Sequence, residues 1–166
     1  MNYHKIEKTS VANGTGIRVV LWCSGCRIGC KNCHNPETWD VNSGKLFDDA
    51  AKKELFDALS KPYIQGVTFS GGHPLEKENQ EEIYDLCKEI KDKYPTKDIW
   101  LYTGYKYEFI LGKKILDIIA LCDVVVDGPY IEDQRDITLK FRGSKNQRLI
   151  DVKETLKQGE VITIQN

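Results

Sequence analysis

Short apolar stretches alternate with amphipathic stretches along this chain, and this alternation limits the possible folds more than any other feature. The expected strands are residues 17–24, 66–70, 98–103 and 123–126. The expected helices, in which apolar side chains recur at helical spacing, are residues 48–60, 78–94 and 107–121. Strands that alternate with helices predict an α/β fold with a mostly parallel sheet of βα units, whose crossovers are right-handed.

The most distinctive polar segments follow directly after the expected strands. Gly71-Gly72 follows one strand, Thr103-Gly104 ends another, and a cluster of cysteines begins where residues 17–24 end. Ligands of parallel α/β sheets bind at the carboxyl ends of the strands. The sequence therefore predicts one binding site at this edge of the sheet. After residue 126 the chain reads as irregular until a short apolar segment at 161–164.

The composition is that of an ordinary globular protein of 166 residues, 40% hydrophobic and 30% charged. Because 24 Lys and Arg residues are balanced by 25 Asp and Glu, no large net field would attract nucleic acid or an anionic membrane. No repeat or linker divides the chain, which predicts a single domain over residues 1–166. No apolar run approaches the roughly 20 residues that span a bilayer, and residues 1–8 lack the apolar stretch of a signal peptide, so we expect a cytoplasmic protein.

Four of the six cysteines lie between residues 23 and 33. In a cytoplasmic chain such clustering indicates metal or redox chemistry rather than disulfides. Cys26, Cys30 and Cys33 have the spacing Cys-x3-Cys-x2-Cys, and three thiolates at this spacing can ligate three irons of one [4Fe–4S] cluster. The fourth iron would then be open to a substrate, as one position is in catalytic metal sites.

Three other uses of these cysteines remain open at this point. Four thiolates, including Cys23, could hold a structural zinc, although only three residues separate the two Cys-x2-Cys pairs, fewer than in most such sites. Cys23 could instead complete a closed cluster that only transfers electrons, although its place near the end of a strand limits its reach. Either pair could support thiol–disulfide exchange, which would leave the third cysteine of the triplet and the glycine motifs without a role.

Five further motifs accompany the triplet. They are residues 13–18 (Asn-Gly-Thr-Gly-Ile-Arg), 34–39 (His-Asn-Pro-Glu-Thr-Trp), 100–105 (Trp-Leu-Tyr-Thr-Gly-Tyr), 126–128 (Val-Asp-Gly) and 141–147 (Phe-Arg-Gly-Ser-Lys-Asn-Gln). Together with the triplet and the aromatic ring directly after it, they resemble the glycyl-radical-enzyme activases of the radical S-adenosylmethionine superfamily. Within that family they are most similar to the branch that activates anaerobic ribonucleoside-triphosphate reductase, and they cover nearly the whole chain.

This resemblance implies an oxidoreductase with a partial (truncated) radical S-adenosylmethionine barrel. S-adenosylmethionine would chelate the open iron, and an electron from the cluster would cleave its S–C5′ bond to give methionine and a 5′-deoxyadenosyl radical. That radical would take a hydrogen atom from a glycine near the C-terminus of the reductase's large catalytic subunit. A reduced flavodoxin or a similar carrier would supply the electron. Activation of another glycyl-radical enzyme would use the same chemistry, so that alternative stays open.

The resemblance also assigns roles to the cysteine loop. Cys26, Cys30 and Cys33 would be the cluster ligands. Asn32, Cys33 and His34 match the stretch that lies against S-adenosylmethionine, with the ring of His34 toward the adenine.

The glycine motif would form the other end of the pocket. The backbone of Gly71 and Gly72 would receive the methionine end of S-adenosylmethionine, and Thr103 and Gly104 would line the same pocket. One position departs from the family pattern, because an acidic residue usually follows the two glycines and this chain has His73. A neutral imidazole can accept a hydrogen bond from the ammonium group in place of the carboxylate. On this reasoning His73→Asp would preserve or improve binding.

Overall fold

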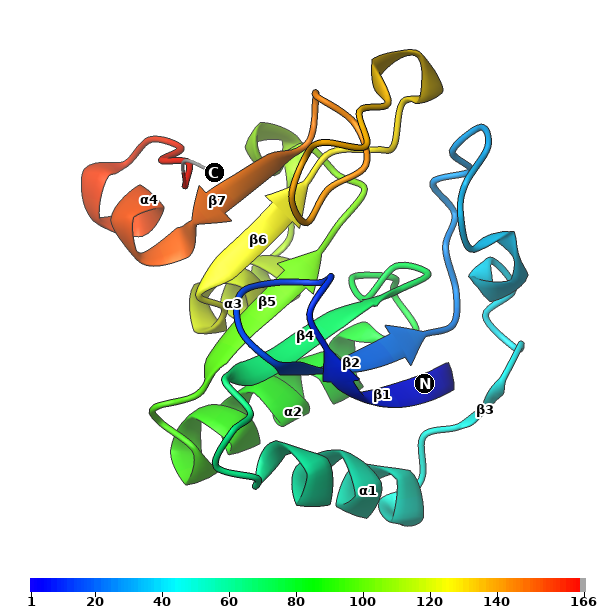
Figure 1. Cartoon of the computed structure of the whole chain (residues 1–166), viewed down its shortest axis with the longest axis vertical. Helices are drawn as coiled ribbons and strands as arrows, with labels where there is room; N and C mark the ends of the chain where they lie inside the picture. The colour runs from blue at the N-terminus through cyan, green and yellow to red at the C-terminus, as the bar shows by residue number, and fades with distance from the viewer. Residues whose placement is uncertain (165–166) are drawn as a thin grey trace.

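One mixed sheet organises residues 1–164, which the computed structural model describes (Figure 1). Its strand order is β3-β1-β2-β4-β5-β6-β7. The strands are β1 (Asn2–Ser10), β2 (Arg18–Cys23), β3 (Lys45–Leu46), β4 (Gly66–Gly71), β5 (Asp98–Tyr102), β6 (Val124–Asp127) and β7 (Arg148–Asp151). The α-helices are α1 (Asp49–Leu59), α2 (Gln80–Lys93), α3 (Lys113–Leu121) and α4 (Val152–Gln158). Within these residues, no helix is long and apolar enough to cross a membrane.

The central strands form the parallel unit that the sequence predicted. β2, β4, β5 and β6 pair in parallel, and α1, α2 and α3 lie in the connections between them. The predicted α/β fold with βα units is therefore confirmed. The outer strands differ from that pattern, because β1 pairs antiparallel with β2, β3 with β1, and β7 with β6.

The sequence prediction was wrong near both ends of the chain. β1 is a strand that the sequence pattern did not indicate, since its residues are mostly polar. β7 and α4 occupy part of the stretch after residue 126 that reads as irregular. Residues 161–164 form no full strand, because only Thr163 bridges to Ile150.

One predicted helix is shorter than expected. Within residues 107–121, α3 begins only at Lys113. Gly112 precedes it with a φ of 106°, a backbone conformation that cannot continue a right-handed helix. Tyr107–Phe109 forms a separate 3-10 turn. The predicted start of the first helix is confirmed, because the Asp48 carboxylate accepts the Ala51 amide of α1 at 2.9 Å.

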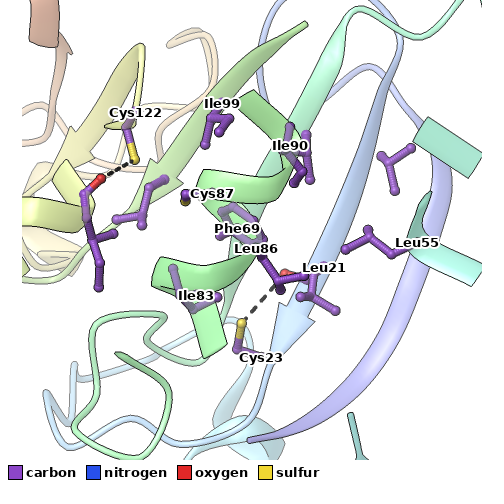
Figure 2. Close-up of a cluster of buried hydrophobic side chains, with 14 of the residues drawn as sticks. Leu21, Cys23, Leu55, Phe69, Ile83, Leu86, Cys87, Ile90, Ile99 and Cys122 are labelled. Carbon is purple, nitrogen blue, oxygen red and sulfur yellow. Dashed lines mark hydrogen bonds between the residues drawn. The ribbon is translucent and has the colours of Figure 1, made fainter. Parts of the chain in front are cut away.

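Side chains of the central strands alternate between two faces of the sheet, as the pleat requires. On β2, Val19, Leu21 and Cys23 pack in the larger core cluster together with side chains of α1, α2 and α3. Figure 2 shows Leu21 and Cys23 beside Ile83 and Leu86 of α2. The intervening residues of β2 point to the opposite face, where Trp22 reaches the cavity described below. This alternation decides which strand residues can contact a ligand.

The opposite face contains a fully buried arginine. Arg18 donates from Nε to the Thr68 hydroxyl at 2.8 Å, and from its two terminal nitrogens to the carbonyls of Val67 and Thr15 at 2.9 and 3.0 Å. Its guanidinium also pairs with the Asp98 carboxylate at 2.5 Å. A charge buried in this way is stable only while its partners are in place. Arg18 thus ties the loop before β2 to β4 and β5.

Candidate metal centre

A cavity of about 520 Å³ opens at the carboxyl ends of the parallel strands. Its wall combines the loop after β2, the turn after β4, the end of β5 and parts of the segment between β6 and β7. The wall contains nearly all the site residues predicted from the sequence, namely Cys26, Cys30, Cys33, His34, Gly71, Gly72, Thr103 and Gly104. The fold therefore brings together residues from three separate places in the sequence.

The cysteine loop leaves β2 as an extended segment that is held by backbone hydrogen bonds. Gly25 donates its amide to the Thr38 carbonyl at 2.7 Å, and Cys26 donates to the Trp39 carbonyl at 3.0 Å. The loop thus doubles back on itself after residue 26 and returns beside its own beginning. This return places the later cysteines over the same cavity as Cys26.

A tight turn connects the other two cysteines of the triplet. The Cys33 amide donates to the Cys30 carbonyl at 3.2 Å, and Asn32 inside this turn has a φ of 58°, which asparagine tolerates better than most residues. Asn32, which the sequence analysis placed against the ligand, is not among the described residues that line the cavity. The Asn35 amide donates to the Cys33 sulfur at 3.4 Å, so the backbone after the turn also contacts the third sulfur.

The donor set fits an iron–sulfur cluster. Cys26, Cys30 and Cys33 are free, partly buried thiols on one wall. Within residues 1–164, no three His, Cys, Asp or Glu side chains converge closely enough to hold a single metal ion. Cluster ligands need not converge in that way, because each thiolate binds a different iron. Burial raises the pKa of the Cys26 thiol, so this ligand would release a proton when iron binds.

Cys23 does not share this wall. Its side chain is 0% exposed, and its sulfur faces the Leu21 carbonyl, 4.0 Å away, on the helix side of the sheet (Figure 2). Burial raises the pKa of the Cys23 thiol to about 12, whereas a metal ligand must be a thiolate. Cys87 and Cys122 are buried in the same core. Cys23 is therefore poorly placed to be the fourth ligand of a closed cluster or of a zinc site.

The turn after β4 leaves no room for side chains. Gly71 has a φ of 110°, and a Cβ atom there would lie 2.4 Å from the Cys23 nitrogen. A Cβ atom on Gly72 would lie 2.7 Å from the Gly25 carbonyl oxygen. Two glycines are therefore needed for the turn to pack against the beginning of the cysteine loop. Their backbone lines the cavity, where it can approach a ligand closely.

His73 occupies the position where the family pattern has an acid, but its ring nitrogens contact protein groups. Nδ1 lies 3.2 Å from the Glu76 carboxylate and Nε2 lies 2.8 Å from the Thr103 hydroxyl. The ring is therefore not free to accept a hydrogen bond from the ammonium of a ligand. This geometry also removes the reason for expecting His73→Asp to improve binding, because the substitution would bring a second negative charge close to the Glu76 carboxylate.

Tyr130, which lies in none of the sequence motifs, completes the wall together with His34 and Phe141. The rings of His34 and Tyr130 lie 4.8 Å apart at an angle of 48°, and both line the cavity. A Cβ atom on Gly143 would meet the Tyr130 ring at 3.1 Å, so this glycine lets the backbone pass close to the ring pair. Phe141 lies on the same wall with a φ of 67°, and its carbonyl accepts the Tyr102 hydroxyl at 2.5 Å. Tyr130 lies in an irregular segment, where no periodic pattern could identify it.

Comparison with known proteins agrees with this site. A family model described as a 4Fe-4S single cluster domain matches residues 12–150. This range includes the cysteine loop, the glycine turn and the aromatic wall. The comparison therefore supports a [4Fe–4S] cluster in this protein.

Curated relatives match over nearly the whole chain. A protein of Enterobacteria phage T4 is 46% identical over 151 residues, covering 90% of this chain and 93% of its own length. Proteins of Haemophilus influenzae and Escherichia coli are 40% and 39% identical over 149 residues, covering 89% of this chain and 96% of their own lengths. All three are named anaerobic ribonucleoside-triphosphate reductase-activating protein. With this identity over this coverage, the chain belongs to the family of anaerobic ribonucleoside-triphosphate reductase-activating proteins.

Proposed function

We propose that this protein reductively cleaves S-adenosylmethionine at a three-cysteine [4Fe–4S] cluster and thereby generates the glycyl radical of the anaerobic ribonucleoside-triphosphate reductase. The observation that carries the proposal is that the cysteine triplet and the glycine turn open into one cavity, while Cys23 faces the core on the other side of the sheet. Three thiolates leave one iron without a protein ligand, beside backbone that can receive a substrate. The names of the relatives support the reductase as partner.

The cysteine loop holds the metal group in this proposal. Cys26, Cys30 and Cys33 would hold three irons of the cluster, which when bound and reduced would supply the electron for cleavage of the sulfonium S–C5′ bond. Asn32 shapes the turn between the second and third ligands. The electron comes from a separate carrier, for which we propose a reduced flavodoxin-type protein.

The remaining wall orients S-adenosylmethionine. The backbone of Gly71 and Gly72 receives the methionine end, and Thr103 and Gly104 line the pocket between them and the aromatic wall. His34 contacts the adenine through its ring, supported by the neighbouring Tyr130. Aromatic faces bind a planar base by stacking and exclude water from the reacting bond.

We assign the fold, as part of the same proposal, to a single-domain, truncated radical S-adenosylmethionine barrel. Four parallel strands supply one side of the cavity, and the segment between β6 and β7 supplies wall residues such as Phe141. Because loops rather than further βα units complete the wall, this side of the cavity is where a macromolecular substrate can approach.

The test is an anaerobic reconstitution with iron and sulfide, followed by reduction and electron paramagnetic resonance spectroscopy. The expected result is a [4Fe–4S]⁺ signal whose shape changes when S-adenosylmethionine is added, with methionine and 5′-deoxyadenosine formed in equal amounts once the reductase is present. A glycyl radical signal on the reductase should accompany the products. A cluster signal that does not respond to S-adenosylmethionine would instead indicate an electron-transfer module, and the proposal would be wrong.

A further inference from the structure

Glu76 is a buried carboxylate that contacts His73 of the cavity wall, and it belongs neither to the cysteine triplet nor to the glycine pair. Its side chain is 4% exposed. One carboxylate oxygen accepts the Arg27 amide at 2.9 Å and faces His73 Nδ1 at 3.2 Å, and the other accepts Arg27 Nη1 at 2.6 Å. A buried carboxylate needs such partners, since an unpaired charge is costly to bury. All three contacts are to residues next to the proposed binding elements.

These contacts join the cysteine loop to the glycine turn. Arg27 is the residue after the first cysteine of the triplet, and His73 is the residue after Gly72. The same junction is reinforced by the backbone, because the His73 amide donates to the Gly25 carbonyl at 2.7 Å. Glu76 therefore contacts side-chain and backbone groups on both sides of the place where the two elements meet.

The hydrogen-bond directions at His73 follow from the charge of Glu76. Hydrogen bonds from His73 and Arg27 lower the pKa of Glu76 to about 2, so the group is a carboxylate that can only accept. His73 Nδ1 must then donate to it, and Nε2 on the other side of the ring lies 2.8 Å from the Thr103 hydroxyl. The Thr103 oxygen in turn accepts the Tyr105 amide at 3.1 Å. The contacts continue in this way from the cysteine loop to the end of β5.

We infer that Glu76 is a positioning residue that fixes the cysteine loop on the glycine turn, and so sets where the cluster lies relative to the methionine end of S-adenosylmethionine. The part that concerns S-adenosylmethionine rests on the proposed function, whereas the part that concerns the loop does not. Arg27 contacts Glu76 in two ways. Its backbone amide is held in place by the chain, whereas its guanidinium is on a side chain that is largely exposed. The amide contact is therefore the more direct measure of the role of Glu76.

The chain offers a matched control. Glu78 also binds the Arg27 guanidinium, at 2.5 Å, but it contacts neither the Arg27 amide nor His73 in the described structure. Glu76→Gln and Glu78→Gln each remove one negative charge beside Arg27. Only the first removes the carboxylate between the cysteine loop and the glycine turn.

The first measurement is amide hydrogen exchange of residues 26–33 in the cluster-free protein, kept anaerobic and reduced. Loss of a charge-assisted hydrogen bond should speed exchange of the Arg27 amide about tenfold or more in Glu76→Gln and leave it unchanged in Glu78→Gln. After reconstitution, Glu76→Gln should also lose iron to a chelator faster than the wild type. Its dissociation constant for S-adenosylmethionine should rise about tenfold, with no comparable change in Glu78→Gln.

Two results would overturn the inference. One is an Arg27 amide that exchanges equally fast in the wild type and in Glu76→Gln. The other is faster exchange throughout the core strands of Glu76→Gln that is not reversed at Arg27 in Glu76→Asp, the second variant, which keeps the charge. Glu76 would then be a general stabilising residue. If the wild type does not bind S-adenosylmethionine, the proposed function fails, but the exchange and iron-loss results still decide the role of Glu76.

Discussion

Cys26→Ala, Cys30→Ala and Cys33→Ala are each expected to abolish cluster binding, whereas Cys23→Ala should retain it. A cluster that is held by three thiolates loses a ligand in each of the first three variants, and the described residues place no other cysteine on the cavity wall. Cys23 faces the helix-side core, so its removal leaves the donor set intact. The measurement is iron and sulfide per chain after anaerobic reconstitution, together with the electron paramagnetic resonance spectrum.

The control for this series is Cys87→Ala, which also removes a buried thiol from the core. Cys23→Ala and Cys87→Ala should behave alike, with full iron content and an unchanged response to S-adenosylmethionine. A loss of iron in Cys23→Ala, but not in Cys87→Ala, would mean that the loop rearranges to bring a fourth thiolate to the cluster. The open iron, and the reaction proposed at it, would then have no structural basis.

Arg18→Met is expected to destabilise the cluster-free protein by about 3 kcal/mol, the lower end of the range for breaking a buried ion pair, because Asp98 is partly exposed. The methionine fills similar space but leaves the Thr68 hydroxyl and the carbonyls of Val67 and Thr15 without their donor. Such a loss is a large fraction of the total stability of a small domain. Urea denaturation followed by circular dichroism, under reducing anaerobic conditions, gives the change in the free energy of unfolding.

Lys53→Met is the matched surface control. Lys53 pairs with Asp57 one helical turn away, and both side chains are exposed, so no measurable change in stability is expected. Equal stability of Arg18→Met and Lys53→Met would show that the buried contacts of Arg18 contribute nothing net. A change in the urea dependence of Arg18→Met, rather than in its midpoint, would point to an altered unfolded or native state instead.

The fold could be predicted from the sequence where periodicity was strong. The buried runs around Phe69 and Val125, and the helical spacing of Ile83 and Ile90, indicate βα units directly. β1 and α4 gave no such signal, because each has few apolar residues and packs through a single stripe. Their structure depends on pairing and packing partners far away in the sequence, which local propensity does not contain.

The site residues could be predicted only where the spacing of residues in the sequence itself indicates a function. The triplet Cys26, Cys30 and Cys33 has a spacing that few other structures need, and glycine pairs at strand ends indicate close backbone approach. Glu76 and Tyr130 had no such pattern, since their roles follow from contacts with residues distant in the sequence. The resemblance to the family gave His73 a contact with the ligand, whereas its ring nitrogens are hydrogen-bonded to Glu76 and Thr103.

The alternation of side chains along β2 also has a consequence for how this site could change over time. Odd-numbered positions of the strand face the helices and even-numbered ones face the cavity side, so the odd position of Cys23 keeps its sulfur out of the cavity. A slip of one residue in the pairing with β4 would deliver that sulfur to the cavity, but it would also turn Arg18 away from Thr68 and Asp98. The strand register that secures the buried arginine would thus also protect the open position that we propose at the fourth iron. Few single mutations could convert this site into a closed electron carrier without unfolding the sheet that holds it.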